Sequence, residues 1–179
     1  MRVFLLATAL LVLAPVLAAP AHAGGAYISV NGGMFNPGSD YPDDYETGLA
    51  AGLSYVMVNE YAGFEFGLGG YTVSSDLYDE DIKSIGLEML VHFHKTDSTI
   101  QPFIALGLAR YRNVFTSGTL EETYTGGGGV LKVGARLYLS PRMFIGAYYK
   151  RLTNDVDLNT GTLNLGGDFI LGELGIVTF

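Results

Sequence analysis

Apolar and polar residues alternate with a period of two along most of the chain after residue 24. The clearest segment is 128–139, where one face carries Leu131, Val133, Ala135, Leu137 and Leu139 and the other carries Lys132, Gly134, Arg136 and Tyr138. A period of two indicates a β-strand, because successive strand side chains point to opposite faces. No segment shows a capped apolar repeat of 3.6 residues. The pattern therefore predicts an all-β chain.

Clusters of Gly, Asn, Asp and Ser divide this alternation into eight predicted strands. The strands are Ala26–Met34, Thr47–Val58, Tyr61–Val73, Ile82–His94, Ile100–Arg112, Gly128–Leu139, Met143–Thr153 and Thr162–Phe179. Long connections at 35–46, 74–81, 113–127 and 154–161 alternate with short ones at 59–60, 95–99 and 140–142. An up-and-down sheet then has all its long loops at one end, and strands of this length can cross a bilayer. The sequence predicts an eight-stranded antiparallel up-and-down transmembrane β-barrel.

The alternation by itself does not say which face points outward. A soluble, lipocalin-like barrel has its apolar face inside, whereas a membrane barrel turns that face to lipid. The polar faces are mostly Gly and Ser with isolated charges, which suits a narrow interior better than a surface in water. This composition favours the membrane barrel and leaves the soluble carrier as the alternative.

Isolated charges on the polar faces predict a network inside the barrel. A buried charge is tolerated only when it is paired and hydrogen-bonded, so we expect neighbours of opposite sign. The expected members are Glu65, Glu88, Lys132, Arg136 and Lys150. The alternative is that some of these charges lie at a rim of the barrel.

Tyrosines near the predicted strand ends suggest aromatic girdles at the two membrane interfaces. These are Tyr27, Tyr55, Tyr61, Tyr71, Tyr111, Tyr138, Tyr148 and Tyr149. The high β-propensity of tyrosine is an alternative reason for their presence in strands.

The first 23 residues predict a secretory signal peptide. Met1 and Arg2 precede the apolar run 3–17, and Ala21-His22-Ala23 provides a small-x-small cleavage site. A membrane anchor is the alternative, but the run is shorter than the ~20 residues that a spanning helix needs. We therefore expect an exported barrel domain over residues 24–179 after cleavage.

Composition excludes several classes of protein. The net charge of −8 argues against a nucleic-acid partner, which needs basic surface. The absence of Cys excludes disulfides and thiolate metal sites. A hydrophobic share of 49% excludes a disordered acidic chain.

Acidic residues concentrate in the predicted long loops. The first two loops contain Asp40, Asp43, Asp44, Glu46, Asp76, Asp79, Glu80 and Asp81, and the others add Glu121, Glu122, Asp155 and Asp157. Carboxylates at one end of the barrel suit divalent cations, although their spacing matches no EF-hand. The alternative is a solvated acidic rim. Gly126–Gly129 is expected to be a flexible part of the third loop.

His92 and His94 are the two histidines that remain after the predicted cleavage. Two histidines on one strand face could form half of a metal site, but no further His or Cys completes it, so we expect no metal. A structural place at the periplasmic rim is the favoured interpretation. A catalytic site is not expected.

The strands, the segment Gln101–Leu108 and the terminal Ile176–Phe179 resemble the small outer-membrane β-barrel family, which includes the OmpA transmembrane domain, OmpX and the opacity-type surface antigens. The resemblance implies a bacterial outer-membrane location, contact with membrane lipid and lipopolysaccharide, and recognition of Phe179 by the barrel-assembly machinery. Phe169, Leu171 and Val177 share the parity of Phe179, but so does Glu173, which requires a bulge or the opposite facing.

The expected function is a structural or surface-interaction role carried out through the acidic external loops, without a cofactor and with a monomeric barrel. A small-solute conduit and a lipid-modifying enzyme remain alternatives, beside the soluble carrier. An eight-stranded lumen is expected to be filled by side chains, which disfavours the conduit.

Overall fold

The computed structural model describes residues 25–41, 44–59, 61–75, 77, 79–94, 100–158 and 161–178. The predicted signal peptide and Phe179 lie outside this part of the chain. The strands are β1 (Gly25–Pro37), β2 (Gly48–Val58), β3 (Ala62–Ser75), β4 (Glu80–His94), β5 (Ile100–Ser117), β6 (Leu120–Ser140), β7 (Met143–Leu152), β8 (Asp155–Leu158), β9 (Gly161–Asn164) and β10 (Gly167–Val177). Within the described residues, no helix has the length and hydropathy to span a bilayer.

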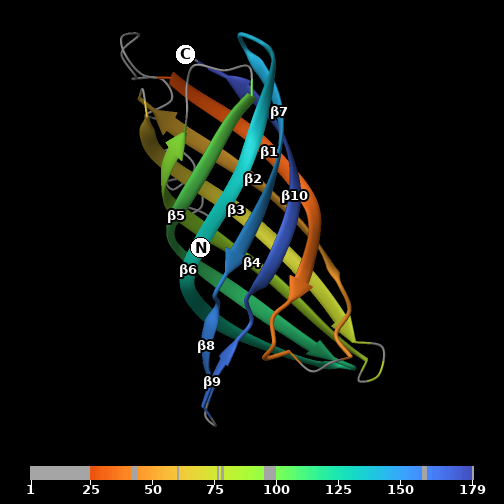
Figure 1. Cartoon of the computed structure of the whole chain (residues 1–179). Coiled ribbons are helices and arrows are strands. Elements are labelled where there is room, and N and C mark those ends of the chain that lie inside the picture. The colour runs from red at the N-terminus through yellow and green to blue at the C-terminus, as the bar shows by residue number, and fades with distance from the viewer. Residues whose placement is uncertain are drawn as a thin grey trace, which may run out of the picture.

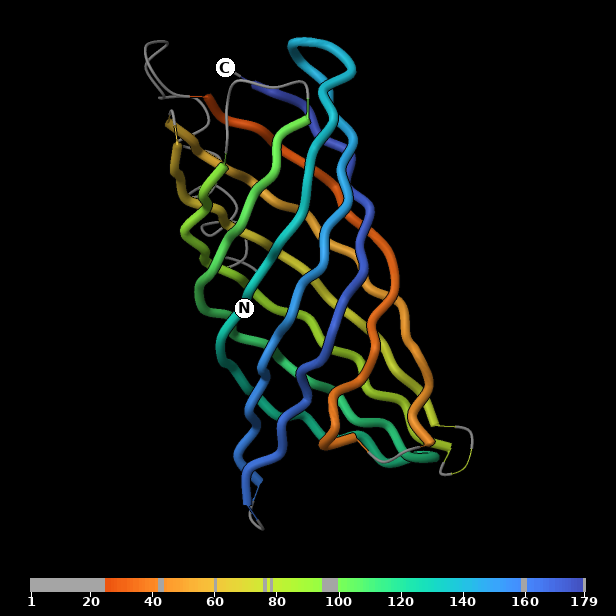
Figure 2. The backbone as a smooth tube through the Cα atoms, in the orientation of Figure 1, coloured from red at the N-terminus to blue at the C-terminus, as the bar shows by residue number. Residues whose placement is uncertain are grey.

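Eight of these strands close into an antiparallel barrel. The sheet order is β5-β4-β3-β2-β1-β10-β7-β6, and pairing of β5 with β6 closes it. The strands run obliquely around the barrel in Figure 1 and Figure 2, as closure of a small barrel requires. Strands β8 and β9 form a hairpin that projects from the lower end in Figure 1 and joins the barrel where Gly126 and Gly127 pair with β8. The eight-stranded barrel predicted from the sequence is confirmed.

The outward face of the barrel is apolar. Along β4, exposed Ile85, Leu87 and Met89 alternate with buried Ser84 and Glu88, and the other strands alternate in the same way. Leu108 on β5 is 71% exposed. Large apolar side chains outside and charges inside are the arrangement of a membrane barrel and the reverse of a soluble lipocalin-like barrel.

We call the end with the long connections the external end, after the expectation from the sequence. It contains more regular structure than the sequence predicted. Segment 113–127, expected to be a loop, is instead the hydrogen-bonded end of the β5–β6 hairpin, which turns at Gly118 and Thr119. Gly118 has φ +56°, a conformation that glycine adopts without strain. The expected flexible segment Gly126–Gly129 lies within β6, so that prediction is wrong. The glycine-rich sequence was interpreted as a loop, but in the structure it continues the hydrogen-bonded pairing of β6 with β5.

The last predicted strand, Thr162–Phe179, is two elements. Residues 161–164 form β9, and β10 begins at Gly167 after a break at Leu165 and Gly166. The predicted loop 154–161 likewise contains β8.

The last strand has the opposite facing, which is the second of the two alternatives that the sequence left open. Phe169, Leu171 and Glu173 are buried in the lumen, and Ile170 and Leu174 are exposed on the outside. The β1–β10 register runs from Tyr27 to Pro37 without a bulge. Glu173 thus points inward together with its apolar neighbours. Period-two alternation could not show this, because both faces of this strand contain large apolar residues.

Most of the tyrosines expected in interfacial girdles point into the lumen instead. Tyr61 and Tyr149 are exposed and Tyr55 shares the outward parity of Leu53, whereas Tyr27, Tyr71, Tyr111 and Tyr148 are buried in the lumen and Tyr138 is partly buried there. The larger apolar cluster includes Phe35, Tyr71 and Phe169 toward the external end and extends to Phe103, which stacks on His92. A smaller cluster of Tyr27, Val56 and Phe144 lies at the opposite end. The charged residues are interleaved with the larger cluster, since Phe103 also lies against Arg136.

Candidate functional site

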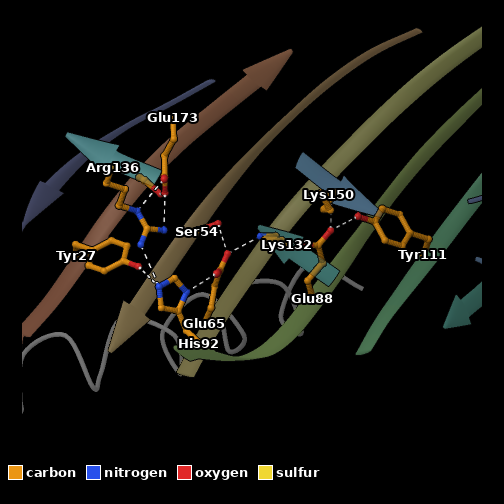
Figure 3. Close-up of polar contacts among 11 residues, drawn as sticks. Tyr27, Ser54, Glu65, Glu88, His92, Tyr111, Lys132, Arg136, Lys150 and Glu173 are labelled. Atoms are coloured by element: carbon orange, nitrogen blue, oxygen red, sulfur yellow. Dashed lines mark hydrogen bonds and ion pairs between the residues drawn. The ribbon is translucent and has the colours of Figure 1, made fainter. Parts of the chain in front are cut away.

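Six charged side chains are buried in the middle of the barrel. Three carboxylates, Glu65, Glu88 and Glu173, face three cations, Lys132, Arg136 and Lys150, and each residue is at most 7% exposed. The signs balance, so the lumen carries no net charge from this set, which we call the lumen network (Figure 3). Close contact is necessary here because an unpaired buried charge is costly.

Glu65 on β3 receives hydrogen bonds from two sides. Lys132 Nζ donates to Glu65 Oε1 at 2.5 Å, and Ser54 Oγ donates to the same oxygen at 3.0 Å. Lys132 lies on β6, across the lumen from β3, so this ion pair links opposite walls of the barrel.

Glu88 on β4 lies between two lysines. Its Oε1 accepts a hydrogen bond from Lys150 Nζ at 2.7 Å, and its Oε2 lies 3.3 Å from Lys132 Nζ. Tyr111 OH donates to Oε1 at 2.5 Å. Lys132 and Lys150 are register partners on β6 and β7, so Glu88 separates two cations that would otherwise repel each other.

Arg136 on β6 pairs with Glu173 on β10. Arg136 Nε donates to Glu173 Oε2 at 2.9 Å and Nη2 donates to Oε1 at 3.3 Å. Ser29 Oγ donates to the same carboxylate at 2.6 Å. The guanidinium carbon lies 4.0 Å from the ring centroid of Phe103 and 4.6 Å from that of Tyr27. A two-donor pair between aromatic faces holds Arg136 in one orientation.

His92 belongs to the lumen network and not to the periplasmic rim. It is fully buried, and its Nε2 accepts from Arg136 Nη1 at 3.1 Å. Its Nδ1 faces Glu65 Oε2 at 3.4 Å. His92 therefore joins the Arg136–Glu173 pair to the Glu65–Lys132 pair, as the dashed contacts in Figure 3 show. The favoured rim position was wrong, since the β4 register places His92 opposite Ala105, which faces inward.

The lumen network leaves little free space. A cavity of about 10 Å³ lies beside Glu88, Lys132 and Lys150, enough for about one water molecule. On its external side, Phe35 stacks against Tyr71 with a centroid distance of 4.2 Å and against Phe169 at 4.6 Å. The charged and aromatic layers together fill the central cross-section.

A polar layer closes the external end above the aromatic rings. Tyr71 OH and Tyr41 OH both donate to the carbonyl of Leu165, at 2.6 and 2.8 Å. Burial raises the pKa of the Tyr41 hydroxyl well above its ordinary value, so this hydroxyl remains a donor. Asn154 Nδ2 donates to Asn113 Oδ1 at 2.8 Å. Because Leu165 and Asn154 belong to the connection between β7 and β10, these hydrogen bonds fix that connection across the external opening of the barrel.

The acidic residues of the external loops are partly engaged with their neighbours. Ser75 donates to Asp44, and Tyr45 OH donates to Glu80 Oε2 at 2.6 Å, so the first two external connections are cross-linked. Asn164 N donates to Asp40 Oδ2 at 3.2 Å. Glu46, Asp79, Asp81, Glu121 and Glu122 lie at the same end, whereas Asp43 and Asp76 lie outside the described residues. Within the described ranges, no three His, Asp or Glu side chains converge on a possible metal position.

Sequence reasoning proposed five charged members of the lumen network and missed Glu173, His92 and Tyr111. The terminal-strand pattern left Glu173 open between a bulge and the opposite facing, so it was not included in the set. The parity of His92 with Glu88 on the same strand was a usable signal, because both lie on the polar face of segment 82–94.

Comparisons with known proteins agree with this architecture. Residues 4–169 match the sequence family described as outer membrane protein beta-barrel domain. Neisserial surface protein A is similar in structure, with a TM-score of 0.66, 14% identity, and coverage of 84% of this chain and 96% of that one. No curated protein sequence matches significantly.

Two further solved structures share the fold. The N-terminal β-barrel domain of Pseudomonas aeruginosa OprF has a TM-score of 0.56 at 11% identity, covering 86% of this chain and 98% of that one. The attachment invasion locus protein Ail of Yersinia pestis has a TM-score of 0.52 at 16% identity, covering 86% and 97%. At these identities the likeness concerns the fold alone.

Proposed function

The chain belongs to the outer membrane protein beta-barrel domain family, and from that premise we propose that it is a closed, non-conducting membrane barrel that presents an acidic external surface for interaction. The observation that carries the proposal is the lumen network, in which three carboxylates and three cations neutralise one another across the barrel. A lumen filled by such ion pairs stabilises the barrel and offers no path for solutes. Any recognition of a partner then takes place at the exposed end.

The filled lumen supports this function over a small-solute conduit. A conducting barrel needs a continuous aqueous path, and interiors of eight strands are just wide enough for side chains to fill. The ion pairs of Glu65, Glu88 and Glu173 cross that path, and the ring of Phe35 stacks on Tyr71 beyond them.

The external end supports a role in surface interaction. Asp79, Asp81 and Glu121 are exposed there, on a chain whose net charge is −8. A surface with one sign of charge attracts cationic partners, or anionic partners through divalent cations. The expected partners, cationic or bridged by divalent cations, are inferred from the charge of this surface. The proposal includes no catalytic step.

The proposal also includes the route to the membrane. Residues 1–23 serve as the cleaved signal peptide, and Phe179 serves as the residue that the barrel-assembly machinery reads in the mature chain, which inserts as a monomer. Phe179→Ala is expected to lower the amount of heat-modifiable protein in outer-membrane fractions while the total amount made is unchanged.

Cysteine labelling on intact cells tests the orientation of the barrel. The chain contains no Cys, so single-cysteine variants give a clean signal. The two variants are Thr119→Cys and Ser140→Cys. Thr119 lies in the β5–β6 turn, and Ser140 lies at the opposite end of the barrel, where β6 ends before β7. A membrane-impermeant maleimide should label Thr119→Cys on intact cells, and Ser140→Cys only after the outer membrane is opened. The reverse pattern would exclude an external acidic surface.

Adhesion measurements test the acidic surface itself. The variant Asp79→Asn, Asp81→Asn, Glu121→Gln removes three exposed charges. Cells that produce it should bind less well to polylysine-coated glass than cells that produce the original barrel in equal amount. The folded fraction should stay the same, as heat-modifiable gel mobility would show. Unchanged adhesion would refute the role of these acidic residues in surface interaction.

A further inference from the structure

One edge of β6 is unpaired near the external tip of the β5–β6 hairpin. β6 pairs with β5 as far as Leu120. On its other side, β6 pairs with β7 only from Val130 onward and with β8 only at Gly126 and Gly127. The tips of the β5–β6 and β8–β9 hairpins point in different directions in Figure 1, so the two hairpins separate beyond this pairing. We call the unpaired side of residues 121–125 the free edge.

The backbone groups at the free edge belong to Glu121, Thr123 and Thr125. Further along β6, the N–H and C=O of Gly129 point away from β5, since they bond the hydroxyl and the N–H of Thr153 at 2.7 and 2.9 Å. Successive residues turn these groups to alternate edges of a strand, and the β5–β6 register contains no bulge. Every second residue from Gly129 to the tip therefore turns its backbone donor and acceptor to the free edge. Such a row is a template for another strand.

Other strand edges at the same end are covered by the chain itself. Beside β3, the N–H of Glu46 donates to the carbonyl of Ser74 at 3.1 Å. At the edge of β9, the N–H of Asn164 donates to the carboxylate of Asp40 at 3.2 Å. Among the described residues, no further strand or backbone hydrogen bond covers positions 121–125 of β6. The β6 edge is therefore open to a partner.

The charge along the free edge selects that partner. Glu121 is exposed on the outward face at the tip. Asp81 lies in the same row, because both residues are register partners of Thr116. Toward the membrane, Arg112 is the register partner of Thr125. A strand added to this edge thus meets carboxylates at the tip and a cation at its other end.

We propose that the free edge binds an extended peptide segment as an added antiparallel strand, with basic side chains at the C-terminal end of the peptide. β6 runs from the tip toward the membrane, so an antiparallel partner ends beside Glu121. Main-chain hydrogen bonds supply affinity, and the cross-strand charge pair supplies the preference for a base. The antiparallel direction is the more stable per residue. The inference rests on the proposed function, because it names the partner class of the acidic external surface.

A second copy of the chain fits the free edge less well. Two copies in one membrane have the same orientation, so their β6 strands run in the same direction. Parallel pairing of two free edges would place Glu121 of one copy near Glu121 of the other. Carboxylates at that spacing repel each other, which favours a basic peptide over self-association.

Fluorescence anisotropy with the purified full barrel in a non-ionic detergent tests the free edge. The probe is a labelled peptide of alternating threonine and valine, as long as the free edge, that ends in two lysines. Thr123→Pro removes an N–H at the free edge and none that bonds β5, so binding should weaken by about tenfold or more. Thr123→Val is the matched control, because it keeps this N–H, and it should bind like the original. Unchanged binding by Thr123→Pro would overturn the proposal.

Modified peptides separate strand addition from attraction between charges. N-methylation at alternate positions removes the N–H groups from one edge of the peptide, and it is made in both frames. One frame should lose binding and the other should keep it, since only one edge of the peptide faces β6. Equal binding in both frames would overturn the proposal, because it would indicate contact through charge alone.

The order of charges in the peptide tests the direction of the added strand. Lysines moved to the N-terminal end should weaken binding by about two- to fivefold, the size of one cross-strand charge pair. Glu121→Gln should abolish this difference. Tighter binding of the peptide with N-terminal lysines would overturn the antiparallel arrangement.

Folding and orientation are checked separately, so that the possible failures are distinguishable. Heat-modifiable mobility verifies folding of Thr123→Pro, and should that variant not fold, the two methylation frames on the original barrel decide alone. A dimer that forms without peptide and is lost in Thr123→Pro would overturn the proposal in favour of a second copy. Failed external labelling of Thr119→Cys contradicts the proposed function, whereas normal labelling without peptide binding in detergent contradicts only this inference.

Discussion

The cations of this barrel occur in two environments with opposite consequences. Inside, Lys132, Arg136 and Lys150 are buried, and each contacts at least one carboxylate. Outside, Lys83 and Arg110 are exposed and form no ion pair within the described residues. Burial compels internal pairing because water cannot solvate the charge, whereas an exposed cation remains available to a partner.

The same comparison separates stability from binding. Charges of the lumen network hold opposite walls of the barrel together, so their removal should change the free energy of unfolding. The exposed cations Lys83, Arg110 and Arg112 form no ion pair among the described residues, so their removal should leave the free energy of unfolding nearly constant and affect only what the outer face contacts.

Glu88→Gln should produce the largest loss of stability. It leaves Lys132 and Lys150, which are register partners, without the carboxylate that lies between them. Breaking a buried ion pair costs about 3–5 kcal/mol. Urea unfolding of the barrel in detergent, followed by gel mobility and circular dichroism, measures the change. A loss below about 1 kcal/mol would mean that water reaches these lysines.

Removing both members of the Arg136–Glu173 pair should cost less than the two single losses together. Arg136→Met and Glu173→Leu each leave one buried charge behind, at a cost of about 3–5 kcal/mol. The double variant leaves none, so we expect a coupling energy of about 1–3 kcal/mol in a double-mutant cycle. His92 also contacts Arg136, so the cycle is repeated in a His92→Phe background. Simple additivity would show that the pair does not act as a unit.

Substitutions of two glycines, one on the inner face and one on the outer face, should change the free energy of unfolding by smaller amounts. A Cβ on Gly134 would lie 2.5 Å from both the Ala147 carbonyl oxygen and Tyr148 Cβ, so Gly134→Ala should destabilise the barrel by about 1–3 kcal/mol. A Cβ on outward-facing Gly172 meets nothing closer than 3.8 Å. Gly172→Ala should be neutral or stabilise by up to about 1 kcal/mol. The same unfolding measurement compares them, and equal effects would contradict the assigned facing.

The smallest effects are expected on the outside. Arg151→Gln removes a pair whose members are 67% and 40% exposed. A triple variant with Lys83→Gln, Arg110→Gln and Arg112→Gln removes no ion pair among the described residues. Each should change the free energy of unfolding by less than about 1 kcal/mol. A larger loss in the triple variant would mean that these cations contribute to folding, and the contrast between the two environments would fail.

Much of the barrel could be predicted from sequence because its strands repeat one simple pattern. The eight-strand count followed from period-two segments, and the inward parity of Lys132 and Arg136 followed from segment 128–139, where the two faces differ strongly. Alternation alone has no sign, but the Gly, Ser and isolated charges of the polar faces predicted that the apolar face points outward, and the structure confirms it.

What could not be predicted was decided by contacts between distant residues. The facing of Glu173 stayed open because Phe169 and Leu171, large and apolar, share its face. His92 became a network member through its contacts with Glu65 on β3 and Arg136 on β6, which are distant in sequence. Segment 113–127 was taken for a loop because its glycines and polar residues have turn-like composition, although its two halves pair as a hairpin.

Single-channel recording in planar bilayers tests the central claim that the paired charges and aromatic rings close the lumen. Purified barrel is reconstituted, and insertion is verified by heat-modifiable mobility of protein recovered from the same preparation. The closed lumen predicts no conductance steps above the bare bilayer at neutral pH. Reproducible steps of uniform size from the original protein would show an open aqueous path past Glu65, Glu88 and Glu173, and would contradict it.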